Sequence, residues 1–229
     1  MSFDGTWRAL AVVALLVSLV SCGGSSGPSE PSPGPTSGPT PPPGEAFEYN
    51  GITHVSWWHD AYGQPEASAA RGALAATGGN WAGLLTTWYM EGRSSSTMGP
   101  HPTRTPTDDV VRHAIEEMHA LGLRVMLKPH VDVLDGTWRG QIAPSDPGAW
   151  FASYSEMMLH FAGMARDLGV KMLCVGTEFV TMTDARYLAE WTRVIGQVRA
   201  AYPGLLVYAA NAANPADEFT SVSFWPQLD

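Results

Sequence analysis

The sequence predicts an α/β fold, a (β/α)8 TIM barrel that is incomplete as given because about five β-α units are present. Near-continuous apolar runs alternate with helical patterns, which is typical of parallel strands that are buried on both faces. Polar and aromatic residues gather where each run ends, and barrel enzymes carry their chemistry at that end of their strands. An open doubly wound sheet is the alternative, but the Gly-rich phosphate turn that usually follows its first strand is absent after Trp57. These observations favour the barrel.

The first two β-α units have clear boundaries. An apolar run over residues 52–57 predicts the first strand, and a helix over 65–77 opens with Pro65 and closes before a pair of glycines. Residues 80–90 form the second expected strand. The second helix, over 108–122, begins with two aspartates, and its apolar residues recur at helical spacing.

The later units repeat the same alternation. Their expected elements are a strand over 123–133, a helix from about Trp150 to Leu168, a strand over 170–178, a helix from about Ala185 to Ala201 and a strand over 205–212.

Composition limits the ligands that this chain can take. Lys and Arg total 13 against 22 Asp and Glu, the formal net charge is −9, and no basic run occurs. Nucleic acid and anionic lipid surfaces are therefore not expected partners, since both need clustered positive charge. A neutral or apolar ligand is the better expectation.

The N-terminal segment predicts export. Residues 1–22 contain Arg8, an apolar run over 9–20 that is too short to span a bilayer, and the sequence Leu-Val-Ser-Cys ending at Cys22. This ending resembles the bacterial lipobox, which implies that Cys22 is lipidated; a plain signal peptide with an incidental cysteine is the alternative. The chain is thus expected to be an exported bacterial lipoprotein of the cell envelope or cell surface, attached to the membrane by an N-terminal lipid anchor.

A linker and one domain follow the expected signal peptide. Residues 23–46 are nearly all Gly, Ser, Pro and Thr, so we expect an extended, disordered tether, and residues 47–229 form the folded domain. Cys174, the one cysteine of that domain, lies in an apolar run and is expected to be a small buried core residue without a disulfide.

Candidate site residues stand at the ends of the expected strands. The run Met172 to Phe179 places Glu178 directly after a buried strand, where it either serves the site or merely caps the following helix or pairs with an arginine. Alternation puts Lys128, His130 and Asp132 on one face of the third strand. A metal site built on His130 and Asp132 lacks a third ligand at suitable spacing, and a buried salt-bridge network is the other alternative.

Several segments together resemble glycoside hydrolase family 113. They are the second strand with its TTWYM ending, the segment LGLRVMLKPHVDVLDGTWRGQIAP, the WFASY helix start and LCVGTEF, and the resemblance covers roughly residues 51–229. It implies a (β/α)8 retaining enzyme of a family whose known members cleave β-1,4-mannan.

The resemblance also implies roles. Glu178 is the expected general acid/base, because a strand end is a rigid mount for a carboxylic acid that protonates the departing oxygen. In the wider clan an Asn usually precedes this Glu, and here the position is Thr177. Polysaccharide or oligosaccharide is the expected substrate, and no cofactor or metal is implied, because two carboxylates suffice for retaining hydrolysis. The expected substrate contacts are Trp57, Trp88, Lys128, His130, Asp132, Trp138, Arg139 and Asn211.

The second carboxylate of the mechanism is expected elsewhere. The family's nucleophile is a Glu at the end of strand 7, which would lie beyond Asp229, and residues 47–229 are fewer than the about 250 that a barrel typically takes. We therefore expect the chain to be a truncated reading of an endo-acting β-mannanase-like hydrolase that is inactive by itself. A non-catalytic carbohydrate-binding lipoprotein on a degenerate barrel is the main alternative, and an exported metal-dependent barrel hydrolase is a third.

Overall fold

The computed structural model describes residues 48–212 and 217–229. The predicted signal peptide, Cys22 and the 23–46 linker lie outside these residues. Among the helices that are described, none is both long and apolar enough to cross a membrane.

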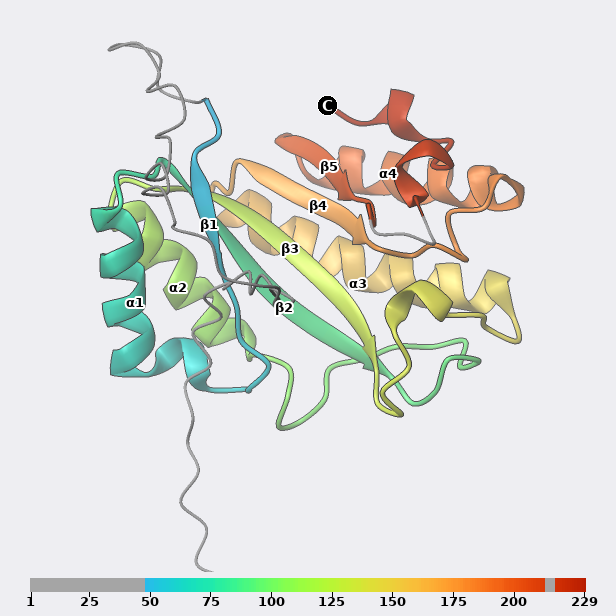
Figure 1. The fold of residues 1–229 in the computed structure, drawn as a ribbon, viewed down its shortest axis with the longest axis horizontal. Coiled ribbons are helices and arrows are strands. Elements are labelled where there is room, and N and C mark those ends of the chain that lie inside the picture. Colours follow the sequence, from blue (N-terminus) through green and yellow to red (C-terminus); the bar gives the residue numbers. More distant parts are fainter. Residues whose placement is uncertain (1–47, 213–216) are drawn as a thin grey trace, which may run out of the picture. The chain divides into compact units, whose positions relative to one another are not determined.

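Five parallel strands form one sheet in the order β1-β2-β3-β4-β5 (Figure 1). Their pairing is continuous from β2 to β3, where Trp81 pairs with Arg124 and Met90 with Val133. Each strand is therefore the neighbour of the one before it, as in a barrel, and the order has none of the reversal that marks a doubly wound sheet. The strands are β1 (Gly51–His54), β2 (Trp81–Met90), β3 (Arg124–Val133), β4 (Met172–Thr177) and β5 (Leu205–Ala209).

The four α-helices cover one face of this sheet (Figure 1). Trp150, Tyr154 and Trp191 are fully buried between the helices and β4, and the Trp150 and Tyr154 rings stack with centroids 4.9 Å apart. The opposite face carries the polar residues that strand alternation turns away from the helices. The helices are α1 (Pro65–Ala76), α2 (Asp108–Ala120), α3 (Pro147–Asp167) and α4 (Leu188–Ala201).

Every predicted strand and helix is present, with shifts of about three residues at several ends, among them the end of the last strand at Ala209 and the start of the third helix at Pro147. The first strand ends at His54 instead of Trp57, because the Trp58 amide donates to Ser56 Oγ at 3.1 Å and this local turn replaces the ladder. The last helix begins at Leu188, after a 3-10 turn over Ala185–Tyr187. Cys174 is buried with a free thiol in β4, which confirms its prediction as a small core residue.

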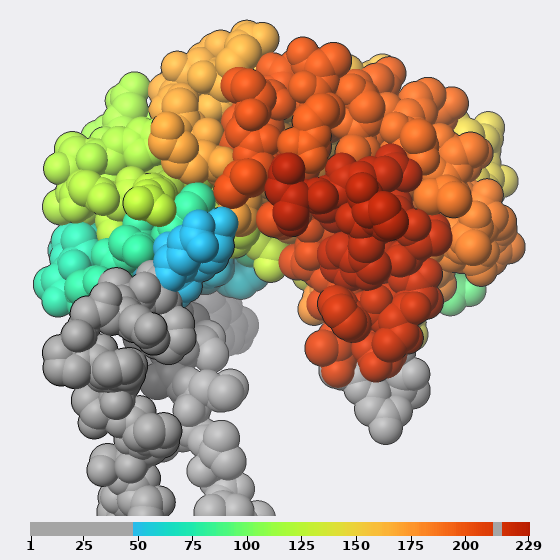
Figure 2. Space-filling view, turned by 90° about the horizontal axis from the view of Figure 1, so that it is seen from above, coloured from blue at the N-terminus to red at the C-terminus, as the bar shows by residue number. Residues whose placement is uncertain are grey.

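The helix-free face of the sheet is hollowed. Figure 2 shows the first strand and the C-terminal residues on either side of this hollow. The site described next lies where the strand ends open onto this face.

Candidate active site

Glu178 lies at the C-terminal end of β4, immediately after Thr177. Its backbone has φ of 56°, in the left-handed region that non-glycine residues seldom adopt. The following residue, Phe179, is fully buried in the core. The left-handed turn therefore allows Glu178 to leave the strand toward solvent while the next side chain enters the core, and 34% of the Glu178 side chain is exposed.

Arg139 joins two carboxylates at this end of the sheet. Its Nη1 donates to Glu178 Oε2 at 3.1 Å, and its Nε donates to Asp132 Oδ1 at 3.1 Å, with a further close contact from Nη2 to the same oxygen. Arg139 Nε also donates to the Val131 carbonyl at 3.2 Å. These contacts hold Glu178 in a defined place beside the end of β3. Pairing with an arginine was the alternative expectation for Glu178, and the structure shows this pairing.

Trp138 is the second residue that contacts the Glu178 carboxylate. Its Nε1 lies 3.5 Å from Glu178 Oε2, and its ring is 40% exposed. A Cβ at Gly140 would overlap the Trp138 ring, so the glycine allows the ring to lie over the backbone of the 3-10 turn Arg139–Gln141.

A cavity of about 560 Å³ opens beside this group. Glu178 is not one of its lining residues, but two of its contacts, Trp138 and Arg139, are. The cavity has aromatic walls with a carboxylate and guanidinium groups among them, a combination suited to a neutral, hydroxyl-rich ligand with flat apolar faces. The lining residues are Trp57, Trp58, Tyr89, Arg104, Asp132, Val133, Gly136, Thr137, Trp138 and Arg139.

The structure corrects the prediction for Trp88. Its ring packs on α3, with centroids 5.8 Å from His160 and 6.0 Å from Phe161, on the helix-covered face. Tyr89 takes the cavity position instead, because it pairs in register with Asp132. Burial, followed by the nearby Asp132 carboxylate, raises the pKa of Tyr89 to about 12, so its hydroxyl stays protonated and can donate. Sequence reasoning considered both aromatic residues at this strand end and chose Trp88, although the alternation that placed Asp132 favours Tyr89.

His130 lies deeper on the same face of β3. It is 6% exposed, and no residue of the described part of the chain hydrogen-bonds either of its ring nitrogens. Burial, with the Arg139 and Lys128 charges as further causes, lowers the pKa of His130 to about 2. The imidazole is therefore neutral. Lys128 is half-buried two residues earlier, on the face where the sequence placed it.

Asn211 belongs to a different group at the end of β5. Its backbone amide donates to Glu218 Oε2 at 2.7 Å, and its carbonyl accepts from the Glu218 amide at 3.0 Å. Glu218 is 1% exposed, and sequence reasoning gave it no positional role. Asn211 therefore sits beside a buried carboxylate rather than against the cavity.

The metal alternative has no support within residues 48–212 and 217–229. These residues contain no group of three or more His, Cys, Asp or Glu side chains that could hold an ion. His130 and Asp132 alone make an incomplete ligand set.

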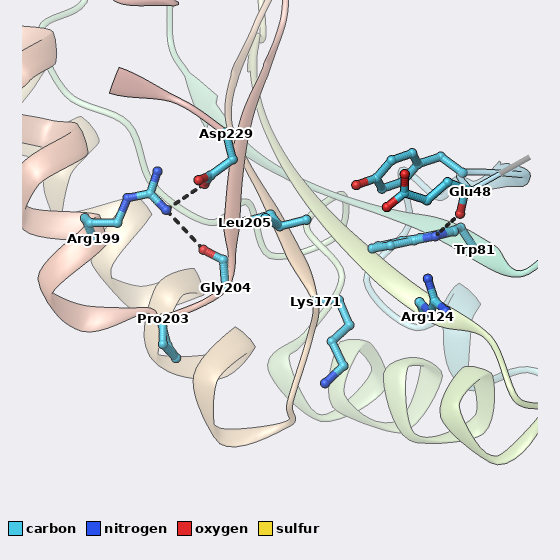
Figure 3. Close-up of a pocket in the computed structure, with 10 residues that line it drawn as sticks. Glu48, Trp81, Arg124, Lys171, Arg199, Pro203, Gly204, Leu205 and Asp229 are labelled. Carbon is cyan, nitrogen blue, oxygen red and sulfur yellow. Dashed lines mark hydrogen bonds and ion pairs between the residues drawn. The ribbon is translucent and has the colours of Figure 1, made fainter. Parts of the chain in front are cut away.

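A second cavity, of about 390 Å³, lies at the other end of the sheet (Figure 3). Its lining includes Trp81, Arg124 and Leu205, which open β2, β3 and β5. Arg199 also lines it and donates to Asp229 Oδ2 at 2.7 Å and to the Gly204 carbonyl at 3.3 Å. Because barrel enzymes carry their chemistry at the C-terminal strand ends, the Glu178 end is the candidate site.

The chain is similar to known glycoside hydrolases. A GH113 β-mannanase, AaManA from Alicyclobacillus acidocaldarius solved in complex with ManMIm, shares 36% identity at a TM-score of 0.73, over 79% of this chain and 58% of that one. A structure of a GH113 β-1,4-mannanase shares 25% identity at a TM-score of 0.71, over 79% of this chain and 60% of that one. A GH113 β-1,4-mannanase complex at 24% identity has the same fold, with a TM-score of 0.71. No curated protein matches the chain.

These likenesses confirm the predicted fold and family. The five β-α units correspond to part of a (β/α)8 barrel, and the chain spans 58% to 61% of the length of these three solved structures. The model of Glycoside Hydrolase Family 113 matches residues 54–229. Because this match extends over most of the sequence, the chain belongs to glycoside hydrolase family 113.

Proposed function

We propose that this chain carries the acid/base half of an endo-acting hydrolase of β-1,4-mannan that works with retention of configuration. The observation that carries the proposal is the position of Glu178, which leaves the end of β4 beside an aromatic-walled cavity and is held there by Arg139. The β-mannanase activity of its solved relatives supports the choice of mannan over other β-linked glycans.

Glu178 acts as general acid and then as general base in this proposal. Its carboxyl group first protonates the glycosidic oxygen that leaves, and it then removes a proton from the water that hydrolyses the glycosyl-enzyme intermediate. One third of the side chain is exposed, so the group can reach a sugar in the cavity. Arg139 and Trp138 fix its direction during both steps.

The cavity supplies the sugar contacts. The rings of Trp57, Tyr89 and Trp138 line it and offer flat apolar surfaces for pyranose faces. Asp132 and Arg139 can hydrogen-bond sugar hydroxyl groups from the same wall. Lys128 and His130 lie further down the same face of β3 and act on the site as neighbouring polar groups, and Asn211 supports the end of β5.

The nucleophile is a second glutamate from outside residues 48–212 and 217–229. Retention needs its carboxylate about 5 Å from that of Glu178. Asp132 is engaged by Arg139, and Glu218 is buried with both oxygens accepting hydrogen bonds, so neither is placed to attack a sugar. A mechanism-based fluoroglycoside inhibitor, followed by mass spectrometry of the labelled peptide, identifies the nucleophile in the intact protein.

The direct test replaces Glu178 by Gln in the intact protein. Hydrolysis of mannan should fall by about 10²-fold to 10⁴-fold, because the amide has the shape of the acid but cannot transfer its proton. Glu156→Gln, an exposed glutamate of α3, is the matched control and should keep full activity. Equal turnover in the two variants would overturn the assignment. Binding of mannooligosaccharide without any product from the unaltered protein would favour a carbohydrate-binding lipoprotein instead.

We further propose that the protein is exported and anchored by a lipid on Cys22. The proposal rests on the apolar run over 9–20 and the Leu-Val-Ser-Cys ending of residues 19–22. Cys22→Ser should release the protein from the membrane fraction and abolish incorporation of labelled fatty acid. Unchanged membrane association of that variant would remove the anchor from the proposal.

A further inference from the structure

The turn that carries Glu178 is an unfavourable backbone conformation. Glu178 has φ of 56°, and it is the single non-glycine residue of the described chain in the left-handed region. Such a conformation is unfavourable for a residue with a Cβ and persists only where its surroundings hold it. The contacts around this turn therefore decide where the Glu178 carboxyl group lies.

Backbone amides tie the turn to β5 on both sides of the Glu178 side chain. The Glu178 amide donates to the Ala209 carbonyl at 2.9 Å, and the Phe179 amide donates to the Tyr208 hydroxyl oxygen at 2.9 Å. A tyrosine hydroxyl at this point replaces the backbone carbonyl that a regular strand would offer. The left-handed turn is thus matched by a side chain of the neighbouring strand.

Tyr208 is itself fixed by a buried carboxyl group. Its hydroxyl donates to Glu218 Oε1 at 2.5 Å, and Thr183 Oγ1 donates to the same oxygen at 3.1 Å. The Asn211 amide donates to Glu218 Oε2 at 2.7 Å. Burial, and then the Glu218 carboxyl group, raise the pKa of Tyr208 well above its usual range, so the hydroxyl keeps the proton it donates.

The local sequence allows this arrangement. The Tyr208 ring passes close to Gly176, where an added Cβ would lie 2.6 Å from its Cε2 atom. Glu218 comes from the 3-10 turn Glu218–Thr220, so a segment beyond β5 reaches back to the end of β4. A chain of hydrogen bonds thus runs from the Phe179 amide through the Tyr208 hydroxyl and the Glu218 carboxyl group to the Asn211 amide, and it spans two strand ends. Its two central side chains are buried, since Tyr208 is 7% exposed and Glu218 1%.

We infer that Tyr208 and Glu218 are positioning residues for the general acid: together they hold the left-handed turn at Glu178 and so aim its carboxyl group at the glycosidic oxygen. The inference rests on the proposed function of Glu178 as acid/base. Neither residue touches substrate in this scheme. Their effect passes through the Phe179 amide to the backbone of Glu178.

Acid catalysis offers a readout that a merely structural role would not change. A sugar leaving group needs protonation by Glu178, whereas a dinitrophenolate leaves without it, so a misdirected acid slows the first kind of substrate selectively. The experiment measures kcat/KM of the intact protein on mannopentaose and on a dinitrophenyl β-mannotrioside. The quantity compared between variants is the ratio of kcat/KM on mannopentaose to kcat/KM on the dinitrophenyl substrate.

Tyr208→Phe removes the hydroxyl that links Phe179 and Glu218. We expect kcat/KM on mannopentaose to fall by tenfold or more, because a small displacement of the Glu178 carboxyl group slows proton transfer. On the aryl substrate kcat/KM should change by less than about twofold. Glu218→Gln, which keeps the side-chain shape, should change the ratio in the same direction. Tyr202→Phe is the matched control, because Tyr202 is also buried and its hydroxyl donates to the Val170 carbonyl at 2.9 Å, before β4 begins.

The possible results separate this inference from the function on which it rests. If Glu178→Gln leaves the ratio unchanged, the proposed acid/base role is wrong. If Glu178→Gln lowers the ratio but Tyr208→Phe and Glu218→Gln behave like Tyr202→Phe, the positioning inference is wrong and the function stands. If Tyr208→Phe fails to fold, the ratio for Glu218→Gln decides the question in the same way.

Discussion

Arg139 and Glu178 meet through one hydrogen bond of 3.1 Å, from Nη1 to Oε2, while Nε and Nη2 of the same guanidinium contact Asp132 Oδ1. Asp132 is in β3 and Glu178 follows β4, so a residue of the intervening turn joins two neighbouring strand ends. The guanidinium side chain is 14% exposed. A planar guanidinium group suits this task better than a lysine ammonium group, because its donors point in fixed directions and can bind two carboxylates at once.

Arg139→Met should therefore lower kcat/KM on mannan by about 10²-fold, since the two carboxylates lose their shared cation and Glu178 loses its main side-chain contact. Arg139→Lys should fall between this variant and the unaltered protein, because an ammonium group cannot bind both carboxylates in the same geometry. Arg166→Met, which removes an exposed arginine paired with Asp167, is the control. Steady-state kinetics and melting curves on the intact protein check the expectation, and activity in Arg139→Met equal to that in Arg166→Met would contradict it.

Gly140 sets the position of the Trp138 ring. An added Cβ would overlap that ring, and the ring would have to leave its place beside Glu178. Gly140→Ala should raise KM for mannooligosaccharides roughly fivefold to tenfold, the loss expected from one aromatic contact of about 1 kcal/mol. Gly196→Ala in α4 meets no atom within 4 Å and is the control; it should bind substrate normally and melt slightly higher. A normal KM in Gly140→Ala would show that Trp138 does not contact the sugar.

The sequence predicted the fold for identifiable reasons, and it singled out Glu178 as a candidate. Apolar strands with polar ends carry a periodic signal, and a carboxylate after the run Met172–Thr177 stands out because nothing in a buried strand needs it. The partners of that carboxylate could not be predicted in the same way. Arg139 and Tyr208 lie 39 and 29 residues from their hydrogen-bond partners Glu178 and Phe179, and only the folded chain brings them together.

Trp88 shows a second kind of limit. Trp88 and Tyr89 are consecutive near the end of β2, so their side chains point to opposite faces of the sheet. The sequence of β2 alone does not decide which of the two faces the cavity. The register against Asp132 settles the phase in favour of Tyr89. The sequence indicated which side chains of β3 face the cavity, but without the register between the strands this could not be extended to β2.

The exchange of Trp88 for Tyr89 can be tested with two substitutions. Tyr89→Leu should raise KM for mannooligosaccharides about fivefold to tenfold, because it removes a ring from the cavity wall. Trp88→Leu should leave KM unchanged and lower the free energy of unfolding by roughly 2 to 4 kcal/mol, because its ring packs against His160 and Phe161. Isothermal titration with mannooligosaccharide and urea denaturation distinguish the two effects. A raised KM in Trp88→Leu with normal stability would restore Trp88 as a substrate contact.

His130 should make the stability of the protein sensitive to acid. Burial, with Arg139 and Lys128 nearby, lowers its pKa to about 2 in the folded state, whereas an unfolded chain has a histidine pKa of about 6.5. Between these values the unfolded state binds a proton that the folded state does not, so the free energy of unfolding rises with pH. The stabilisation is complete above about pH 6.5 and is lost as the pH falls below it, at up to about 1.4 kcal/mol per pH unit.

His130→Phe should remove this contribution to the slope. Burial, and then the Arg71 charge, also lower the pKa of His54, to about 4, so a smaller acid dependence below pH 6.5 should persist in the variant. Urea denaturation of the intact protein at several values from pH 5 to pH 7.5 measures the slope directly. His59→Gln, which changes an exposed histidine, should keep the full slope. Equal slopes for His130→Phe and His59→Gln would mean that His130 is protonated in the folded protein as readily as in the unfolded chain. That result would contradict a neutral His130 imidazole in the folded protein.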